Sequence, residues 1–271
     1  MKNMKKIIAL LLCLALAVFA AGCTIVIDGE TATTAATTAN GTIGLSVSTQ
    51  NNPFFVTLVE GAQAAASELG VELSVADAGD DVAKQVSDIE DLVSSNISVL
   101  IVNPVDSDGV TGAVQAALAK GMAVRSTTDG LVHLLRRESM AKGVKVISVD
   151  RAVNGVDIDC QIASDNVLGA ELATQYIVDT LGEGVKVAEL EGTPGASAAI
   201  DRSEGFHNIA DEHMEVLVSQ TANFDRTEGM TVMENMLQAH GDIQAVFAAN
   251  DEMALGAAEA VAGSGKDIMV V

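Results

Sequence analysis

Residues 42–70 read TIGLSVSTQNNPFFVTLVEGAQAAASELG, a stretch that predicts one strand followed by one helix. The β-branched, apolar run Thr42–Ser48 is typical of a buried strand. Pro53–Leu69 predicts a helix, because proline is tolerated in a first turn and Gly70 suits the position that ends a helix. We therefore expect a strand–loop–helix unit at the start of the regular part of the chain.

The same alternation continues to the end of the sequence. Further strands are expected at 71–76, 98–102, 144–149, 185–190, 214–220, 245–248 and 268–271. Helices are expected between them at 82–93, 110–120, 167–181, 198–210, 227–239 and 253–261. Such alternation implies parallel sheets with helices on both faces. We predict an α/β fold of two doubly wound, Rossmann-like lobes, an N-terminal lobe at 42–164 and a C-terminal lobe at 165–271.

The composition limits the core and the partners. The 271 residues are 49% hydrophobic, which excludes a disordered acidic chain. There are only six Phe, one Tyr and no Trp, so we expect an aliphatic core. The 37 acidic and 15 basic residues give a formal charge of −22, whereas a nucleic-acid-binding protein needs a basic surface. We therefore expect no nucleic-acid partner.

Residues 1–22 have the pattern of a secretory signal peptide. Three lysines precede the apolar run 7–19, which is shorter than the roughly 20 residues of a membrane-spanning helix. The small residues that end in Cys23 look like a bacterial lipobox, in which the cysteine is lipidated; ordinary cleavage beside an incidental cysteine is the alternative. We expect an extracytoplasmic protein, anchored to the bacterial cell membrane by lipidated Cys23 or otherwise periplasmic.

The next residues and the remaining cysteine agree with this. Residues 23–41 are rich in Thr and Ala without apolar periodicity, so we expect a flexible tether after the lipidated cysteine. Cys13 leaves with the signal peptide, so Cys160 is left without an internal disulfide partner. Cys160 is either a reactive thiol or a plain buried or strand residue, and the second interpretation is favoured.

One segment interrupts the alternation. Ala-Lys-Gly at 119–121 recurs at 141–143, and removal of Met122–Gly143 leaves a clean helix-to-strand connection. The segment 122–143 carries three Arg in an acidic chain, and its leucines could form the apolar face of a protein-docking helix. The alternative, which we favour, is an insertion that the fold tolerates as a surface loop.

The residues after the strands are the candidates for ligand binding, because ligands of open parallel sheets bind beyond the carboxyl ends of the strands. Phe54 and Phe55 are adjacent on a helix and point in different directions, so one can lie in the core while the other faces a cleft. Asp150 and Arg151 follow a strand and offer a hydrogen-bond acceptor beside a forked donor. Asn250 could bind a ligand or simply cap the following helix.

Six motifs in a fixed order resemble a known family. They are Asn51-Asn52-Pro53-Phe54-Phe55, Asn103-Pro104-Val105-Asp106-Ser107-Asp108, Val149-Asp150-Arg151, Ile162-Ala163-Ser164-Asp165-Asn166, Phe224-Asp225-Arg226 and Asn250-Asp251-Glu252-Met253-Ala254-Leu255-Gly256. The chain resembles the ribose-binding proteins, which are type I periplasmic-binding-protein-like sugar receptors of ABC transporters. The resemblance runs from about Thr42 to Val271 and implies two lobes that close on one pentose.

By motif, the resemblance implies sugar contacts from eight residues: Asn52, Phe54, Phe55, Asp150, Arg151, Arg202, Phe224 and Asn250. The three Phe would sandwich the sugar ring, and the other five side chains would bond its hydroxyls. The implied ligand is a monosaccharide, with ribose preferred, and the implied protein partner is the permease of an ABC transporter. The resemblance further implies a monomer without a cofactor, a metal or catalytic residues.

The sequence departs from the family pattern at its end. The family continues past the position of Val271 with a Gly-Phe-Asp-Gly turn whose Asp binds sugar, then with a Gln contact at the hinge and the elements that complete the first lobe. We therefore expect lobes that are incomplete at residue 271 and a pocket that lacks these ligand groups.

An enzyme and a transcription regulator fit the sequence less well. The chain has no Gly-x-Ser-x-Gly elbow, no Walker loop and no histidines at metal-ligand spacing, which argues against an enzyme. We also expect Asp150 to be a poor general base, because the neighbouring Arg151 should lower its pKa. A sugar-responsive transcription regulator would need an N-terminal helix-turn-helix where this chain has a signal and tether. A chemotaxis or signalling receptor, and a binder of allose or galactose, remain open.

Overall fold

Strand β1 (Ile43–Val47) and helix α2 (Pro53–Leu69) form the strand–loop–helix unit that the sequence predicts. The computed structural model describes residues 41–120 and 143–271. Helix α2 begins where the side chain of Asn52 accepts a hydrogen bond from the backbone N–H of Phe54. It ends at Gly70, whose left-handed conformation (φ 65°) is one that glycine adopts without strain.

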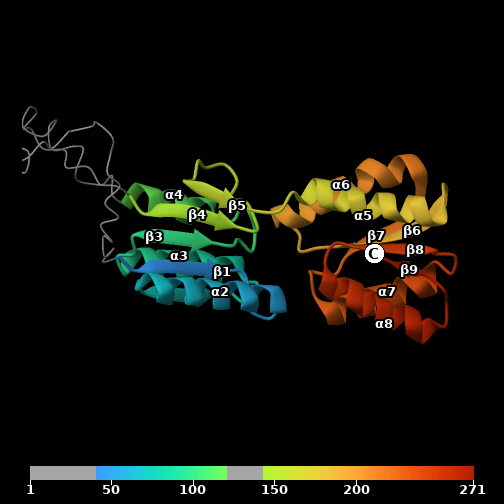
Figure 1. Ribbon diagram of the computed structural model, residues 1–271, viewed down its shortest axis with the longest axis horizontal. Helices are drawn as coiled ribbons and strands as arrows, with labels where there is room; N and C mark the ends of the chain where they lie inside the picture. Colours follow the sequence, from blue (N-terminus) through green and yellow to red (C-terminus); the bar gives the residue numbers. More distant parts are fainter. Residues whose placement is uncertain (1–40, 121–142) are drawn as a thin grey trace, which may run out of the picture. The chain divides into compact units, whose positions relative to one another are not determined.

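The first sheet has five parallel strands in the order β2-β1-β3-β4-β5 (Figure 1). Its other strands are β2 (Leu73–Asp77), β3 (Val99–Val102), β4 (Lys145–Val149) and β5 (Cys160–Ile162). The helices between them are α3 (Val82–Ser94) and α4 (Thr111–Ala119). Because all strands are parallel, the loops that follow β1, β3 and β4 meet at one edge of the sheet.

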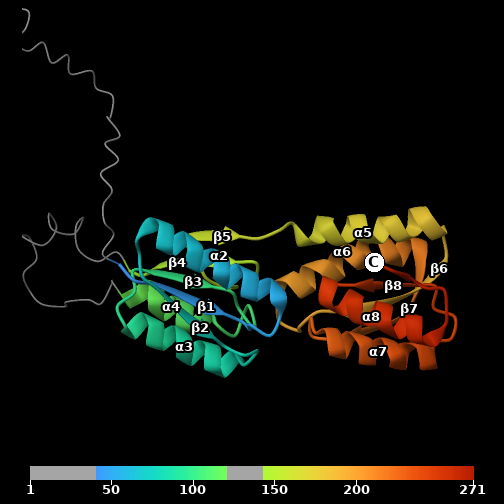
Figure 2. The same ribbon diagram turned by 60° about the horizontal axis from the view of Figure 1, so that its bottom comes forward.

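The second sheet has four parallel strands in the order β7-β6-β8-β9. They are β6 (Val185–Glu191), β7 (Met214–Thr221), β8 (Ala245–Ala248) and β9 (Met269–Val270). The helices are α5 (Asn166–Leu181), α6 (Ser197–His213), α7 (Arg226–Ala239) and α8 (Asp251–Ser264). Figures 1 and 2 show α5 and α6 on one face of this sheet and α7 and α8 on the other, as in a doubly wound fold.

The predicted α/β fold class is confirmed, and every predicted strand and helix is present with boundaries shifted by three residues or fewer. The sequence does not predict β5, because this edge strand is three exposed residues long and has no alternating pattern. Cys160 lies in β5, so its interpretation as a strand residue is correct. Its side chain is exposed, however, so burial is the wrong expectation.

The core is mainly aliphatic, as the composition predicts, but one aromatic pair departs from that prediction. Leu45, Ile89 and Leu100 are fully buried around the first sheet. Phe206 of α6 and Phe247 of β8 are buried, and their rings stack with centroids 4.9 Å apart. The expectation of a purely aliphatic core is therefore wrong for the second sheet.

Several predictions concern residues outside the described ranges. The signal peptide at 1–22, lipidation of Cys23 and almost all of the tether at 23–41 lie there, as does the segment 122–143 except for its last residue. Within residues 41–120 and 143–271, no helix combines the length and the hydropathy that crossing a bilayer requires.

Candidate functional site

A cavity of about 770 Å³ lies beyond the carboxyl ends of strands from both sheets. Its volume is within the range typical of small-molecule sites. All eight residues that the family resemblance singles out line this one cavity, namely Asn52, Phe54, Phe55, Asp150, Arg151, Arg202, Phe224 and Asn250. The first five belong to the loops and helix of the first sheet, and the last three to the second.

The two adjacent phenylalanines differ in exposure, as the sequence predicts. Phe55 is buried with 4% of its surface exposed, whereas Phe54 is 56% exposed, and both rings line the cavity. The rings meet edge to face with centroids 5.1 Å apart. Phe55 therefore belongs to both the core and the cavity wall, while Phe54 offers an open ring face to a ligand.

Arg151 is the most deeply buried charge in the cavity wall, with 2% of its surface exposed. Its Nη1 donates a hydrogen bond of 2.9 Å to the Pro104 carbonyl, and its Nε lies 3.7 Å from Oδ2 of Asp150. Among the described residues this Nε has no hydrogen-bond partner. Burial of a guanidinium N–H without a hydrogen-bond partner costs free energy. A ligand that accepts a hydrogen bond from this Nε would remove that cost.

Burial has the largest effect on the pKa values of Asp150 and Arg151. It raises the pKa of Asp150, although the charges of Arg151 and Arg202 act in the opposite direction. Burial likewise lowers the pKa of Arg151, and the charge of Asp150 opposes that change. The expectation that Arg151 would lower the pKa of Asp150 is therefore wrong in its net direction, because desolvation outweighs the neighbouring cation.

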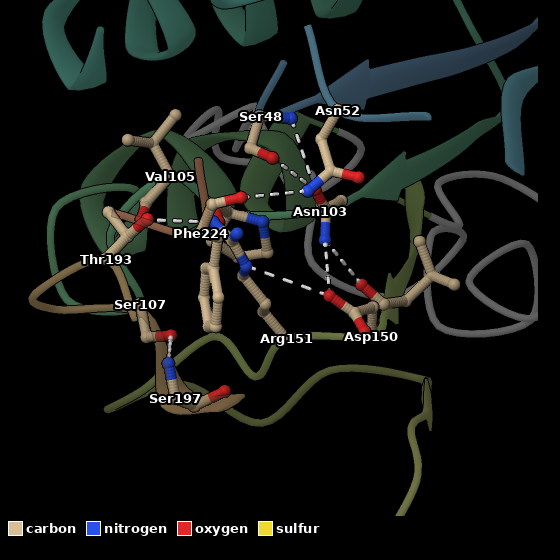
Figure 3. A network of polar contacts seen from close by, with 12 residues as sticks. Ser48, Asn52, Asn103, Val105, Ser107, Asp150, Arg151, Thr193, Ser197 and Phe224 are labelled. Atoms are coloured by element: carbon tan, nitrogen blue, oxygen red, sulfur yellow. Dashed lines mark hydrogen bonds and ion pairs between the residues drawn. The ribbon is translucent and has the colours of Figure 1, made fainter. Parts of the chain in front are cut away.

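Asn103, which follows β3, connects these groups to the rest of the first sheet (Figure 3). Its Oδ1 accepts from the Ser48 hydroxyl at 2.7 Å, and its Nδ2 donates to the Val149 carbonyl and to Oδ2 of Asp150 at 3.1 and 3.3 Å. Its own carbonyl accepts a hydrogen bond of 2.9 Å from Gln85, which is fully buried in α3. Gln85 also accepts from the Val105 N–H at 2.7 Å, so it fixes the loop after β3.

The cations of the cavity lie against its aromatic rings. The guanidinium carbon of Arg151 is 5.2 Å from the centroid of the Phe55 ring and 5.5 Å from that of Phe224, and Figure 3 shows the latter pair side by side. Arg202 lies 5.8 Å from the centroid of Phe224. These cation–π contacts hold both arginines without using up their N–H donors.

The residues from the second sheet are held by their neighbours. Arg202 donates to Oδ1 of Asn166 at 2.9 Å and to the Ala249 carbonyl at 2.6 Å. Asn250 caps α8 by accepting from the Met253 N–H at 2.9 Å, as the structural alternative predicts. Its Nδ2 donates to the Phe224 carbonyl at 3.2 Å, so the side chain lines the cavity while it caps the helix.

Two serines join the loops of the two sheets near this cavity. The Ser197 N–H donates to the Ser107 hydroxyl at 3.1 Å (Figure 3). The Ser107 N–H donates to the Gly195 carbonyl at 3.0 Å. Asn52 makes a similar link, because its Nδ2 lies 3.4 Å from the Phe224 carbonyl. Backbone and side chain therefore both connect the two halves of the cavity wall.

Sequence reasoning missed three residues that support the site. Asn103 occurs in a recognised motif directly after a strand, so its position could have identified it. Asn166 has the same kind of signal, because it stands at the start of a helix beside Asp165, which caps α5. Gln85 has no such signal, since it lies within a helix and its role depends on contacts with a distant loop.

The arrangement suits recognition of a small polyhydroxylated molecule. Aromatic rings cover apolar C–H faces, while carboxylate, amide and guanidinium groups bond hydroxyls. Among the residues that the structure describes, no group of three or more His, Cys, Asp or Glu could hold a metal ion.

The chain is similar in sequence to binding proteins of sugar import systems. The chain is 50% identical over 230 residues to the ribose import binding protein RbsB of Bacillus subtilis, covering 85% of this chain and 68% of the relative. It is 45% identical over 235 residues to RbsB of Escherichia coli, covering 86% of this chain and 72% of the relative. These relatives are binding proteins of import systems, not enzymes.

The chain is also similar to solved structures of ABC transporter binding proteins. An ABC transporter solute-binding protein from Mycobacterium smegmatis with bound glycerol superposes with a TM-score of 0.71 at 36% identity, covering 83% of this chain and 71% of that one. The periplasmic binding protein of an arabinose transporter from Shewanella superposes with a TM-score of 0.70 at 29% identity, covering 83% and 69%. Residues 43–131 and 128–271 match the periplasmic binding protein domain. The chain therefore belongs to the periplasmic binding protein family and has its type I fold.

Proposed function

We propose that this protein captures D-ribose or a similar monosaccharide outside the cytoplasm and delivers it to the permease of an ABC transporter. The observation that carries the proposal is the convergence of eight aromatic and polar side chains from both sheets on one cavity. Identity of 45–50% to ribose import binding proteins supports ribose as the first candidate ligand.

The mechanism is binding without chemistry. The rings of Phe54, Phe55 and Phe224 cover the faces of the sugar, and the remaining five side chains bond its hydroxyls. A sugar that contacts both sets of residues is bound most tightly when the two sets are close together. Binding therefore shifts the population toward a closed form, which is the form that docks on the permease.

The leader sequence supports the proposed place of action. Cleavage after residue 22 and lipidation of Cys23 would tether a monomeric receptor to the bacterial cell membrane, on the extracytoplasmic side where its ligand is captured. Radiolabelled palmitate should be incorporated into the wild-type protein and not into a Cys23→Ser variant. Equal incorporation in both would remove the proposed anchor.

Calorimetric titration tests the ligand. The purified protein is titrated with D-ribose, D-allose and D-galactose, after circular dichroism has established that it is folded. We expect saturable heat with ribose and weaker or no heat with the other two sugars. A folded protein that binds allose or galactose but gives no heat with ribose would overturn the ribose assignment.

A further inference from the structure

Gly192, the residue directly after β6, lies against the tip of the Phe224 ring. A Cβ atom added at Gly192 would lie 2.1 Å from Cζ of Phe224, and 2.3 and 2.7 Å from its two Cε atoms. Real Cβ atoms do not approach other heavy atoms so closely. The position of the ring therefore depends on the absence of a side chain at residue 192.

The loops that carry these two residues are joined by several hydrogen bonds. The Thr221 hydroxyl donates to the Gly192 carbonyl at 2.6 Å, and the Thr193 hydroxyl donates to the Asn223 carbonyl at 3.2 Å. The N–H of Ala222 donates to the Glu191 carbonyl at 2.9 Å. Neither loop can move away from the other without breaking at least one of these bonds.

The Phe224 side chain has little freedom of its own. Its backbone adopts a φ of 61°, a region that is unfavourable for a bulky residue and that occurs where the surroundings enforce it. Its side chain is 8% exposed, and the guanidinium groups of Arg151 and Arg202 lie 5.5 and 5.8 Å from its ring centroid. An added methyl group at residue 192 would thus have to displace the ring from its present position in the cavity wall.

We propose that Gly192 is a positioning residue for ligand binding, and that its missing side chain sets the depth of the Phe224 ring in the cavity wall. The inference rests on the proposed function only in naming a monosaccharide as the ligand that stacks on this ring. A side chain at residue 192 would move the ring out of the plane in which it meets the sugar.

A double-mutant cycle tests this directly. We expect Gly192→Ala to weaken ribose binding about tenfold or more in the wild-type background, and by less than about twofold in a Phe224→Leu background, because directly contacting residues are coupled. Gly263→Ala is the matched control, since a Cβ there meets no atom within 4 Å, and it should leave the ribose Kd unchanged. Equal losses in the two backgrounds, or no loss from Gly192→Ala, would overturn the proposal.

Crystal structures of the sugar-free wild type and Gly192→Ala separate this inference from the proposed function. A displaced Phe224 ring supports the positioning role even if ribose does not bind, whereas an unmoved ring refutes it. If Gly192→Ala does not fold, Thr221→Val removes the hydrogen bonds that the Thr221 hydroxyl makes with the Gly192 carbonyl and the Asn223 N–H, without adding bulk. That variant should shift the same ring, and an unshifted ring would again refute the inference.

Discussion

Asn103 donates a hydrogen bond to Asp150 across 47 residues of sequence, with 3.3 Å between Nδ2 and Oδ2. The same amide accepts from the hydroxyl and the backbone N–H of Ser48, at 2.7 and 3.2 Å. One buried side chain therefore connects the loops after β1, β3 and β4, and it orients a carboxylate at the cavity. A buried polar network stabilises the fold only while all its members are hydrogen-bonded.

Replacement of Asn103 by Ala should reduce both stability and ligand affinity. The Ser48 groups would lose their acceptor inside the protein, which should lower the free energy of unfolding by about 2 kcal/mol. Asp150 would lose an orienting donor, so the ribose Kd should rise. Urea unfolding and calorimetry measure the two effects. The control is Asn208→Ala, an exposed asparagine on α6 that bonds Glu171, and unchanged values for Asn103→Ala would contradict the role of the network.

The two adjacent phenylalanines should separate stability from binding. Phe55→Ala removes a ring that is 4% exposed, so it should lower the free energy of unfolding by about 3 kcal/mol or more. Phe54→Ala removes a ring that is 56% exposed, so it should leave stability nearly unchanged and weaken ribose binding. Urea titrations give the first quantity and calorimetry gives the second. If Phe54→Ala bound ribose as the wild type does, this ring would have no part in recognition.

The fold follows from the sequence where local signals are complete. Helix α2 is predicted residue for residue, because Pro53 starts it and Gly70 ends it. Strand β5 carries no local signal, since its pairing with β4 rather than its own composition defines it. Local pattern therefore fixes helices and buried strands, while an exposed edge strand depends on its neighbour.

Some residues of the candidate site could likewise be predicted from local sequence, whereas others could not. Residues directly after strands could be identified, because the parallel arrangement brings those positions together whatever the details of packing. Gln85 and Gly192 could not be assigned a role, because each acts through contacts with a loop that is distant in the sequence. The pKa of Asp150 was mispredicted for a related reason: the neighbouring Arg151 is visible in the sequence, whereas the extent of burial is not.

His207 should make stability depend on pH. Its Nδ1 lies 2.9 Å from Oδ1 of Asp211, and its Nε2 lies 3.2 Å from Oε2 of Glu189, a carboxylate with 0% exposure. Burial alone would lower the pKa of His207, but these two acidic groups outweigh it and raise the pKa above its ordinary value. Glu191 is the other nearby acid, and burial raises its pKa.

The direction of this pH dependence follows from the linkage between protonation and folding. A histidine whose pKa is higher in the folded state stabilises the protein fully below its unfolded pKa, and the contribution is lost as the pH rises through the folded value. His207→Gln should therefore lower the free energy of unfolding near pH 5.5, by about 1 kcal/mol or less because the ring is partly exposed. Near pH 9 the variant and the wild type should differ less. Urea unfolding at both pH values measures this, and a larger loss at pH 9 would contradict the assignment.

Deletion of Met122–Gly143 should preserve or raise the melting temperature. The structure places Gly143 directly against the end of α4, since a Cβ added there would lie 2.0 Å from the Leu118 carbonyl oxygen. The deletion puts Gly121 before Val144, so a glycine again occupies this tight position. Helix α4 is then joined to β4 by a short connection. A shorter connection also lowers the entropy cost of closing the loop. Calorimetric melting of both proteins, with ribose titration as a second readout, measures the outcome. A clear fall in melting temperature would show that the segment stabilises the fold, and loss of a protein partner would favour the docking-helix interpretation instead.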